Sequence, residues 1–477
     1  MKTNNICLCD RCLKNKHKNP LNRLFHIEEI CLKNCIPPLT LVDNKYNAIN
    51  SLNIIEKAYK LLKSANILAI KDTGGFYLIC NGKSRAAINT LRRRKMRQSK
   101  PFAVMMKDIY TVREFCEVHS EEKKVLESSE RPIVILDKKP SLNLPNNISP
   151  NLKSIGVMLP FSPISRLMLQ KDLDVLIITK SSNIELKNET AFKNLKNIAD
   201  YFLIHNREIS VPLKTPVVYL INHSKCVLNQ SLSSPKKALN NSFSDNFIEI
   251  IYGKENTEYS KNFLGGEFFI KTNKEFKMAA HFQYVTLQGK PSPLSSAISY
   301  LHFFKYNPDS FIANTGITTN ALEKNSNSCL SSIDHFFDCI SSLLDIVHTN
   351  TYAGEAAQAL ESIADATTKD YYKYRIKNEN SAFVIDIKNI LRGVLIDILI
   401  KKEKSMIATK FHNTIYHITC QMALILSKLY GINKIILSGT TFQNKRLLED
   451  VSKGLKKENL RVYFNSKPYL DNTEILL

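Results

Sequence analysis

Residues 67–106 constrain the fold of this chain more than any other stretch. Three short apolar runs predict strands, with a turn at Gly74 and Gly75 between the first two and a helix before the third. Ser84 is a suitable N-cap for that helix. The predicted strands cover residues 67–70, 76–80 and 102–106. Helix and strand signals continue to alternate over residues 39–222, which indicates an α/β domain.

Six cationic side chains fall within positions 92–100, at the end of the predicted helix. Cations are favourable near a helix C-terminus, so a solvated basic face would explain part of this run. Because the run lies between a glycine turn and a buried-looking strand, we favour a site that neutralises a phosphate-bearing ligand.

The chain of 477 residues has a formal net charge of +22, from 66 Lys and Arg against 44 Asp and Glu. Its length indicates two or three domains. The positive charge suits RNA, acidic partners or phosphorylated ligands, although a general richness in lysine gives the same balance without a nucleic-acid role. The sequence has no long apolar run and no apolar signal core, so we expect a soluble, cytoplasmic protein without a membrane partner.

The cysteines near the start of the chain are spaced like zinc ligands. A C-x-x-C pair is followed, after 18 residues, by a second pair, and two thiolate pairs at this spacing can form a tetrahedral site. The predicted ligands are Cys9, Cys12, Cys31 and Cys35. The second pair has three intervening residues, so Cys7 or His26 is an alternative fourth ligand. A group of free buried cysteines is the competing interpretation, and disulfides are not expected in a reducing compartment.

The segment GGFYL…LRRRKMRQSKPFAVM, within residues 74–106, resembles the nucleotide-binding part of the HypF family, the carbamoyltransferases of nickel–iron hydrogenase maturation. It is similar at a longer remove to the YrdC/Sua5 fold. The YrdC-type signature, K-x-R followed far downstream by S-x-N, is met by Lys95, Arg97, Ser181 and Asn183. The resemblance implies that these residues bind nucleotide, with Lys71 and Lys100 nearby. We expect Arg92 and Arg93 on the outer face of the helix.

Other segments resemble the same family in order. CDRC…CIPPLTL looks like a zinc module, and FLGGEFF, SSIDHFFDCISSLL and ILSGTTFQN resemble the family's C-terminal Kae1-like domain, of the actin/Hsp70 type. The implied fold is mixed α/β. The expected parts are a zinc-finger module (1–40), a YrdC-like nucleotide-binding domain (41–222), a linker (223–246) and a Kae1-like carbamoyltransferase domain lacking much of its first lobe (247–477).

Several motifs depart from the family pattern. Residues 179–190 contain no glycine where the family has a glycine-bearing phosphate loop, and Thr440 replaces the second glycine of the family's LSGG turn. The sequence has no H-x-x-x-H pair, which argues against the second bound metal that relatives imply for the C-terminal domain. Because the chain begins just before its zinc module, we also expect the family's acylphosphatase-like domain to be missing.

The resemblance implies a carbamoyltransferase that uses zinc structurally and ATP with Mg²⁺ as substrate. Carbamate derived from carbamoyl phosphate would be condensed with ATP to carbamoyl-adenylate in the YrdC-like domain. The Kae1-like domain would pass the carbamoyl group to the C-terminal cysteine of a partner maturase, a dehydratase. Two alternatives remain open, namely a catalytically impaired paralogue that only binds nucleotide or partner, and a YrdC-type protein that binds double-stranded RNA. We expect any nucleotide chemistry in residues 41–222 and weak or no ATP binding by the C-terminal domain.

Overall fold

The computed structural model describes residues 38–464. The exceptions are residues 73–74, 129, 141–143, 171, 181–186, 207–208, 210–214, 222–223, 230–245, 254–263, 273–274, 309–328, 366–367 and 380–381. The chain divides into two compact units, whose described residues run to Asn229 in the first and from Asn246 in the second. Each unit has its own sheet.

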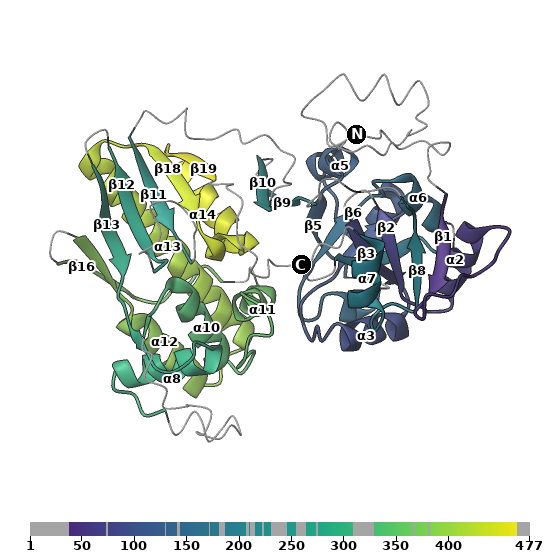
Figure 1. Ribbon diagram of the computed structural model, residues 1–477. Helices are drawn as coiled ribbons and strands as arrows, with labels where there is room; N and C mark the ends of the chain where they lie inside the picture. The colour runs from purple at the N-terminus through teal and green to yellow at the C-terminus, as the bar shows by residue number, and fades with distance from the viewer. Residues whose placement is uncertain are drawn as a thin grey trace. The chain divides into compact units, whose positions relative to one another are not determined.

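The first unit is built on one mixed sheet of ten strands (Figure 1). In spatial order these are β1 (Thr40–Asp43), β8 (Tyr201–Ile204), β2 (Leu68–Asp72), β3 (Gly75–Asn81), β7 (Val175–Lys180), β4 (Ala103–Met106), β6 (Ser154–Met158), β5 (Ile133–Asp137), β9 (Val217–Ile221) and β10 (Ser224–Asn229). Strand β8 separates β1 from β2, so residues far apart in the sequence become neighbours in the sheet.

In the described part of this unit, six helices and a short 3₁₀ turn accompany the sheet. They are α2 (Ile54–Lys63), α3 (Arg85–Arg94), α4 (Ile109–Phe115), α5 (Ser120–Glu127), η2 (Asn146–Ile148), α6 (Pro163–Met168) and α7 (Asn188–Leu195). Helix α3 buries Ala87, Ile88 and Leu91 in a core that includes Leu78 and Val104. Burying such apolar side chains is the main term that holds a helix against a sheet.

The predicted N-cap of α3 is confirmed, because the Oγ of Ser84 accepts a hydrogen bond from the backbone N–H of Ala87 at 3.2 Å. The predicted end of this helix is wrong. Helix α3 stops at Arg94, and Met96 adopts a positive φ of 51°, which turns the chain before Arg97. Arg97 therefore lies in the loop beyond the helix.

Part of the predicted linker is also sheet. Strand β10 lies within residues 223–246, the stretch predicted as a linker, and pairs antiparallel with β9. The domain boundaries stay predictions.

The second unit has a seven-stranded sheet. Its order is β16 (Arg375–Glu379), β17 (Ala382–Asp386), β13 (Phe276–Phe282), β12 (Glu267–Lys271), β11 (Phe247–Ile251), β18 (Lys434–Ser438) and β19 (Arg461–Phe464). Strands β11, β12 and β13 form an antiparallel meander, and β18 and β19 continue parallel to β11. A two-stranded sheet, β14 (Thr286–Leu287) with β15 (Cys329–Leu330), lies outside the main sheet.

The helices of this unit are α8 (Pro293–Phe303), α10 (Ile333–Leu343), α11 (Glu355–Ile363), α12 (Lys388–Leu399), α13 (Lys404–Tyr430) and α14 (Lys445–Lys457), with the 3₁₀ turn η5 (Thr440–Gln443). Helices α8, α10 and α12 gather at one end of the sheet (Figure 1). Helix α13 ends at its C-cap Gly431, whose φ of 65° is the left-handed conformation that glycine adopts readily. Within the described ranges, neither of the two units contains a helix long and apolar enough to span a membrane.

Candidate functional site

The register of the first sheet brings several chain segments to one edge. Strand β2 runs parallel to β8 and antiparallel to β3, and β7 runs antiparallel to both β3 and β4. The carboxyl ends of β2, β7 and β8 therefore lie at the same edge as the amino ends of β3 and β4. The basic loop that follows α3 enters β4 at this edge, so its cations meet the end of β7.

Lys95 is the C-cap of α3, and its Nζ donates a hydrogen bond to the carbonyl of Lys180, the last residue of β7, at 2.6 Å. Burial of the ammonium, together with the nearby charges of Arg97 and Lys100, lowers its pKa to about 8. A bound anion would offset this unfavourable cationic environment.

Arg97 crosses to the same strand. Its Nη1 donates to the Oγ1 of Thr179 at 3.2 Å, its Nε donates to the carbonyl of Lys100 at 3.1 Å, and its Nη2 donates to the carbonyl of Pro101. The guanidinium also lies 4.5 Å from the ring centroid of the fully buried Phe102. These contacts fix the direction of Arg97 relative to β7.

The expectation that Arg92 faces outward is wrong. Arg92 is only 8% exposed, and its guanidinium donates five hydrogen bonds to backbone carbonyls. The acceptors are Arg97, Gln98, Lys100, Asn147 and Ile148, at 2.6–3.1 Å. Arg92 therefore organises the basic loop from inside the unit. Arg93 is exposed, as expected.

Lys71 is 4% exposed near the end of β2, and its Nζ donates to the carbonyl of His205, just after β8, at 3.1 Å. The adjacent Asp72 accepts a 2.6 Å hydrogen bond from the hydroxyl of Ser162, the N-cap of α6. Lys100 is half-buried in the basic loop. The four candidate cations, Lys71, Lys95, Arg97 and Lys100, thus gather near one edge of the sheet, and we call them the cation cluster.

Ser181 and Asn183 lie outside the described residues, as do the predicted zinc ligands Cys9, Cys12, Cys31 and Cys35. Thr179 and the carbonyl of Lys180, which receive the basic loop, are not among the predicted site residues. A signal for them is present in the sequence, because both directly precede the S-x-N pair. The contact of β7 with the basic loop is not predictable from local patterns.

In the second unit, the G-G-E segment builds a small buried polar site. The carboxylate of Glu267, 1% exposed, accepts hydrogen bonds from the backbone N–H groups of Leu264, Gly265 and Gly266 at 2.8–3.1 Å. The hydroxyl of Tyr284 donates a fourth at 3.0 Å. Burial nevertheless raises the pKa of Glu267 above its usual value, and the four hydrogen bonds oppose that rise.

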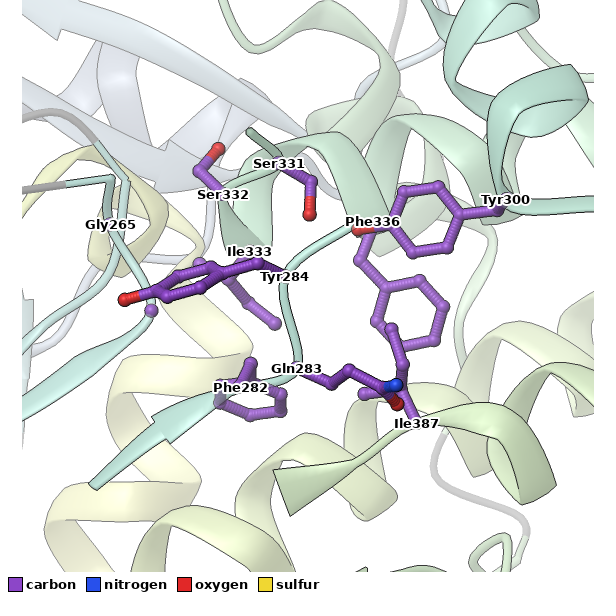
Figure 2. Close-up of a pocket in the computed structure, with 11 residues that line it drawn as sticks. Gly265, Phe282, Gln283, Tyr284, Tyr300, Ser331, Ser332, Ile333, Phe336 and Ile387 are labelled. Carbon is purple, nitrogen blue, oxygen red and sulfur yellow. The ribbon is translucent and has the colours of Figure 1, made fainter. Parts of the chain in front are cut away.

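A pocket opens beside this segment (Figure 2). Tyr284 points toward Gly265 on one side, and the stacked rings of Tyr300 and Phe336, 5.2 Å apart, lie on the other. The lining residues are Gly265, Gly266, Phe282, Gln283, Tyr284, Tyr300, Ser331, Ser332, Ile333, Phe336 and Ile387. None of them is cationic, so this pocket does not suit a phosphate, in contrast to the cation cluster.

His412 of α13 is buried, and both of its ring nitrogens form hydrogen bonds within the protein. Its Nδ1 donates to the carbonyl of Ala408 at 2.8 Å, and its Nε2 accepts from the side-chain amide of Asn444 at 2.9 Å. Burial lowers its pKa to about 4, so the imidazole is neutral near pH 7. Within the part of the chain that the structure describes, no three His, Cys, Asp or Glu side chains gather as metal ligands.

Three family models match successive parts of the chain. A HypF finger model matches residues 8–42, a model described as telomere recombination, of the Sua5/YciO/YrdC type, matches 60–231, and the second subdomain of the carbamoyltransferase Kae1-like domain matches 259–472. The order of these models is the order predicted from the sequence.

Curated relatives carry the same family name. The chain is 25% identical to carbamoyltransferase HypF of Synechocystis, over 83% of this chain and 68% of that protein. It is 33% identical to carbamoyltransferase HypF of Rhodobacter capsulatus over 45% of this chain, and 38% identical to the probable carbamoyltransferase HypF of Methanocaldococcus jannaschii over 35%. The last two alignments span only 29% and 22% of the relatives' own lengths.

Two solved structures superpose on nearly the whole chain. A full-length HypF in a phosphate- and nucleotide-bound form matches with a TM-score of 0.81 and 26% identity, covering 97% of this chain and 75% of that one. HypF of T. kodakarensis matches with a TM-score of 0.80 and 22% identity, covering 98% and 78%. The second match bears on the fold alone. Together, the three successive family models, the curated relatives and the nucleotide-bound structure show that this chain carries a HypF finger, a YrdC/Sua5-like domain and a HypF-type Kae1-like domain, in the manner of the HypF carbamoyltransferases that it resembles.

Proposed function

We propose that this chain is an ATP-dependent carbamoyltransferase of hydrogenase maturation, with the nucleotide chemistry in residues 41–222. The observation that supports this most directly is the contact of the basic loop with the end of β7, 2.6 Å from Lys95 Nζ to the carbonyl of Lys180. It brings Lys95 of the K-x-R element to Lys180, the residue directly before the S-x-N element, 85 positions later in the sequence. A relative of this fold is known with phosphate and nucleotide bound.

In the proposed reaction, a carboxylate oxygen of carbamate attacks the α-phosphorus of ATP, and pyrophosphate leaves. Lys95 and Arg97 bind the phosphate oxygens and stabilise the charge that develops on the leaving group, with Lys71 and Lys100 nearby and Ser181 and Asn183 as further ligands. Mg²⁺ would accompany the triphosphate. Arg92 does not contact the ligand and holds the loop in place.

The proposal extends to the other parts of the chain. The 247–477 unit would transfer the carbamoyl group to the C-terminal cysteine of a partner maturase, after carbamoyl phosphate has supplied the carbamate. Cys9, Cys12, Cys31 and Cys35 would hold a structural zinc ion. A cytoplasmic location is part of the same proposal.

The experiment that tests the nucleotide site compares Arg97→Ala with Arg93→Ala in the full chain. Charge-assisted hydrogen bonds contribute roughly 1.5–3 kcal/mol each, so Arg97→Ala should weaken ATP binding by about one to two orders of magnitude. Arg93→Ala, which removes the same charge from an exposed position, should leave the affinity nearly unchanged. Isothermal titration measures both, with thermal unfolding as the control for folding.

Titration at two salt concentrations separates this proposal from RNA binding. An RNA surface would lose similar affinity in both variants, and its affinity would fall steeply with salt because phosphate contacts release counterions. If Arg97→Ala binds ATP as the parent does, the cation cluster is not the nucleotide site.

A further inference from the structure

Asp334 of α10 is hydrogen-bonded to the turn that follows β18. Its carboxylate accepts a hydrogen bond from the Oγ1 of Thr440 at 3.1 Å and another from the Oγ1 of Thr441. Asp334 lies in the first turn of α10, and the two threonines begin η5. The three side chains therefore join elements that are more than 100 residues apart in the sequence.

Glycine turns close tightly around this contact. A Cβ on Gly253, which follows β11 with a φ of 78°, would lie 2.4 Å from the carboxylate of Asp334 and 2.3 Å from the hydroxyl of Thr440. A Cβ on Gly439, with a φ of 95°, would lie 2.2 Å from the carbonyl of Tyr252. Only glycine fits either position. The backbone at Gly253 therefore lies directly against the carboxylate of Asp334, and the backbone at Gly439 lies directly against the carbonyl of Tyr252.

The position of this contact in the fold is informative. Strands β11 and β18 are parallel neighbours, with Ile251 opposite Ser438, so their carboxyl ends lie together. Ligands of α/β sheets bind at carboxyl strand ends, and glycine turns there receive anions through close backbone approach. Here the turn receives the protein's own carboxylate, and the hydroxyls that could donate to a phosphate donate to Asp334.

We infer that Asp334 is a built-in anion that closes the Gly439 turn and excludes nucleotide phosphate from this end of the second sheet. We call the three side chains, Asp334, Thr440 and Thr441, the carboxylate latch. The fixed negative charge repels an incoming phosphate, and the latch takes the hydroxyl donors that would bind it. This inference holds whether or not the cation cluster of the first unit binds ATP.

The test uses the full chain carrying Lys95→Ala and Arg97→Ala, so that the cation cluster does not contribute. Equilibrium dialysis with MgATP then compares this background with its Asp334→Asn variant. Asn keeps the size of the side chain and removes the charge, so ATP binding should strengthen by at least tenfold. The matched control is Asp345→Asn, which makes the same charge change at a mostly exposed side chain two residues after the end of α10.

Two results would overturn the inference. One is equal ATP binding in the Asp334→Asn and Asp345→Asn variants. The other is ATP binding by the background chain that Thr441→Val weakens, because the turn would then receive the nucleotide rather than Asp334.

A double-mutant cycle checks the latch without relying on ATP. Thermal unfolding is measured for Asp334→Asn, Thr441→Val and the double variant. The latch predicts that the double variant is less destabilised than the sum of the two single changes, because Thr441→Val removes the same hydrogen bond that Asp334→Asn weakens by removing its charge. Additive shifts would show that Asp334 and Thr441 do not act together, and would overturn the latch.

Discussion

The guanidinium of Arg92 donates a hydrogen bond to the backbone carbonyl of Arg97 at 3.0 Å. Two arginines of one basic run thus have different tasks, since Arg92 is buried and shapes the loop, whereas Arg97 lies in that loop and reaches β7. Both guanidiniums lie about equally close to the ring of Phe102, at 4.6 and 4.5 Å from its centroid. The number of cations in the run therefore overstates the number available to a ligand.

Arg92→Ala should be strongly destabilising. It removes a donor from five carbonyls of the loop and of η2, of which those of Lys100 and Ile148 keep a second donor. Unsatisfied buried groups cost about 1–3 kcal/mol each, so we expect a loss on the order of 3 kcal/mol in the free energy of unfolding. Arg93→Ala at the exposed neighbouring position should change it by less than about 0.5 kcal/mol. Urea denaturation of both variants measures the difference, and equal midpoints would contradict the structural role of Arg92.

ATP affinity should decrease as the pH rises through about 8. The pKa of Lys95 is lowered to about 8, so its ammonium is protonated below that pH and progressively lost above it. Only the protonated form attracts a phosphate, so binding at pH 7 should exceed binding at pH 9. Lys95→Arg stays charged across this range and should remove most of the dependence. A Lys95→Arg profile as steep as that of the parent would show that another group titrates.

Local patterns predicted much of the first unit. The N-cap Ser84 and the strands around the basic run follow from signals within a few residues. The burial of Arg92 does not follow, because its five acceptors include carbonyls of η2, more than 50 residues away. The carboxylate latch is not predictable for the same reason, because Asp334 and its two threonine partners are more than 100 residues apart in the sequence.

The zinc prediction is tested by metal analysis of the full chain. Substituting Cys9 or Cys12 by Ser should reduce bound zinc to well under one ion per chain, because a tetrahedral structural site needs four ligands. Structural zinc sites contribute about 10–16 kcal/mol in small modules, so the finger should lose protease resistance together with the metal. Zinc retained in Cys35→Ser would identify Cys7 or His26 as the fourth ligand.

Glu267→Gln should destabilise the second unit by about 2 kcal/mol, since an amide offers one acceptor oxygen where the carboxylate serves four donors. The neutral Gln introduces an NH₂ group that faces backbone N–H groups. Glu275→Gln is the control, because Glu275 is exposed and pairs with Lys277 at the surface. Thermal unfolding that shifts equally in both variants would contradict the buried role of Glu267.

The sheet order of the first unit sets the time at which its cation cluster can form during synthesis. The carbonyl that accepts from Lys71 belongs to a residue 134 positions later, and the β2–β8 pairing cannot exist before that residue has been made. At translation rates of about 5–20 residues per second, Lys71 waits roughly 7–27 seconds for this partner. During that interval β2 has one of its two edges unpaired. This edge of β2 is open to pairing with other strands until β8 has left the ribosome.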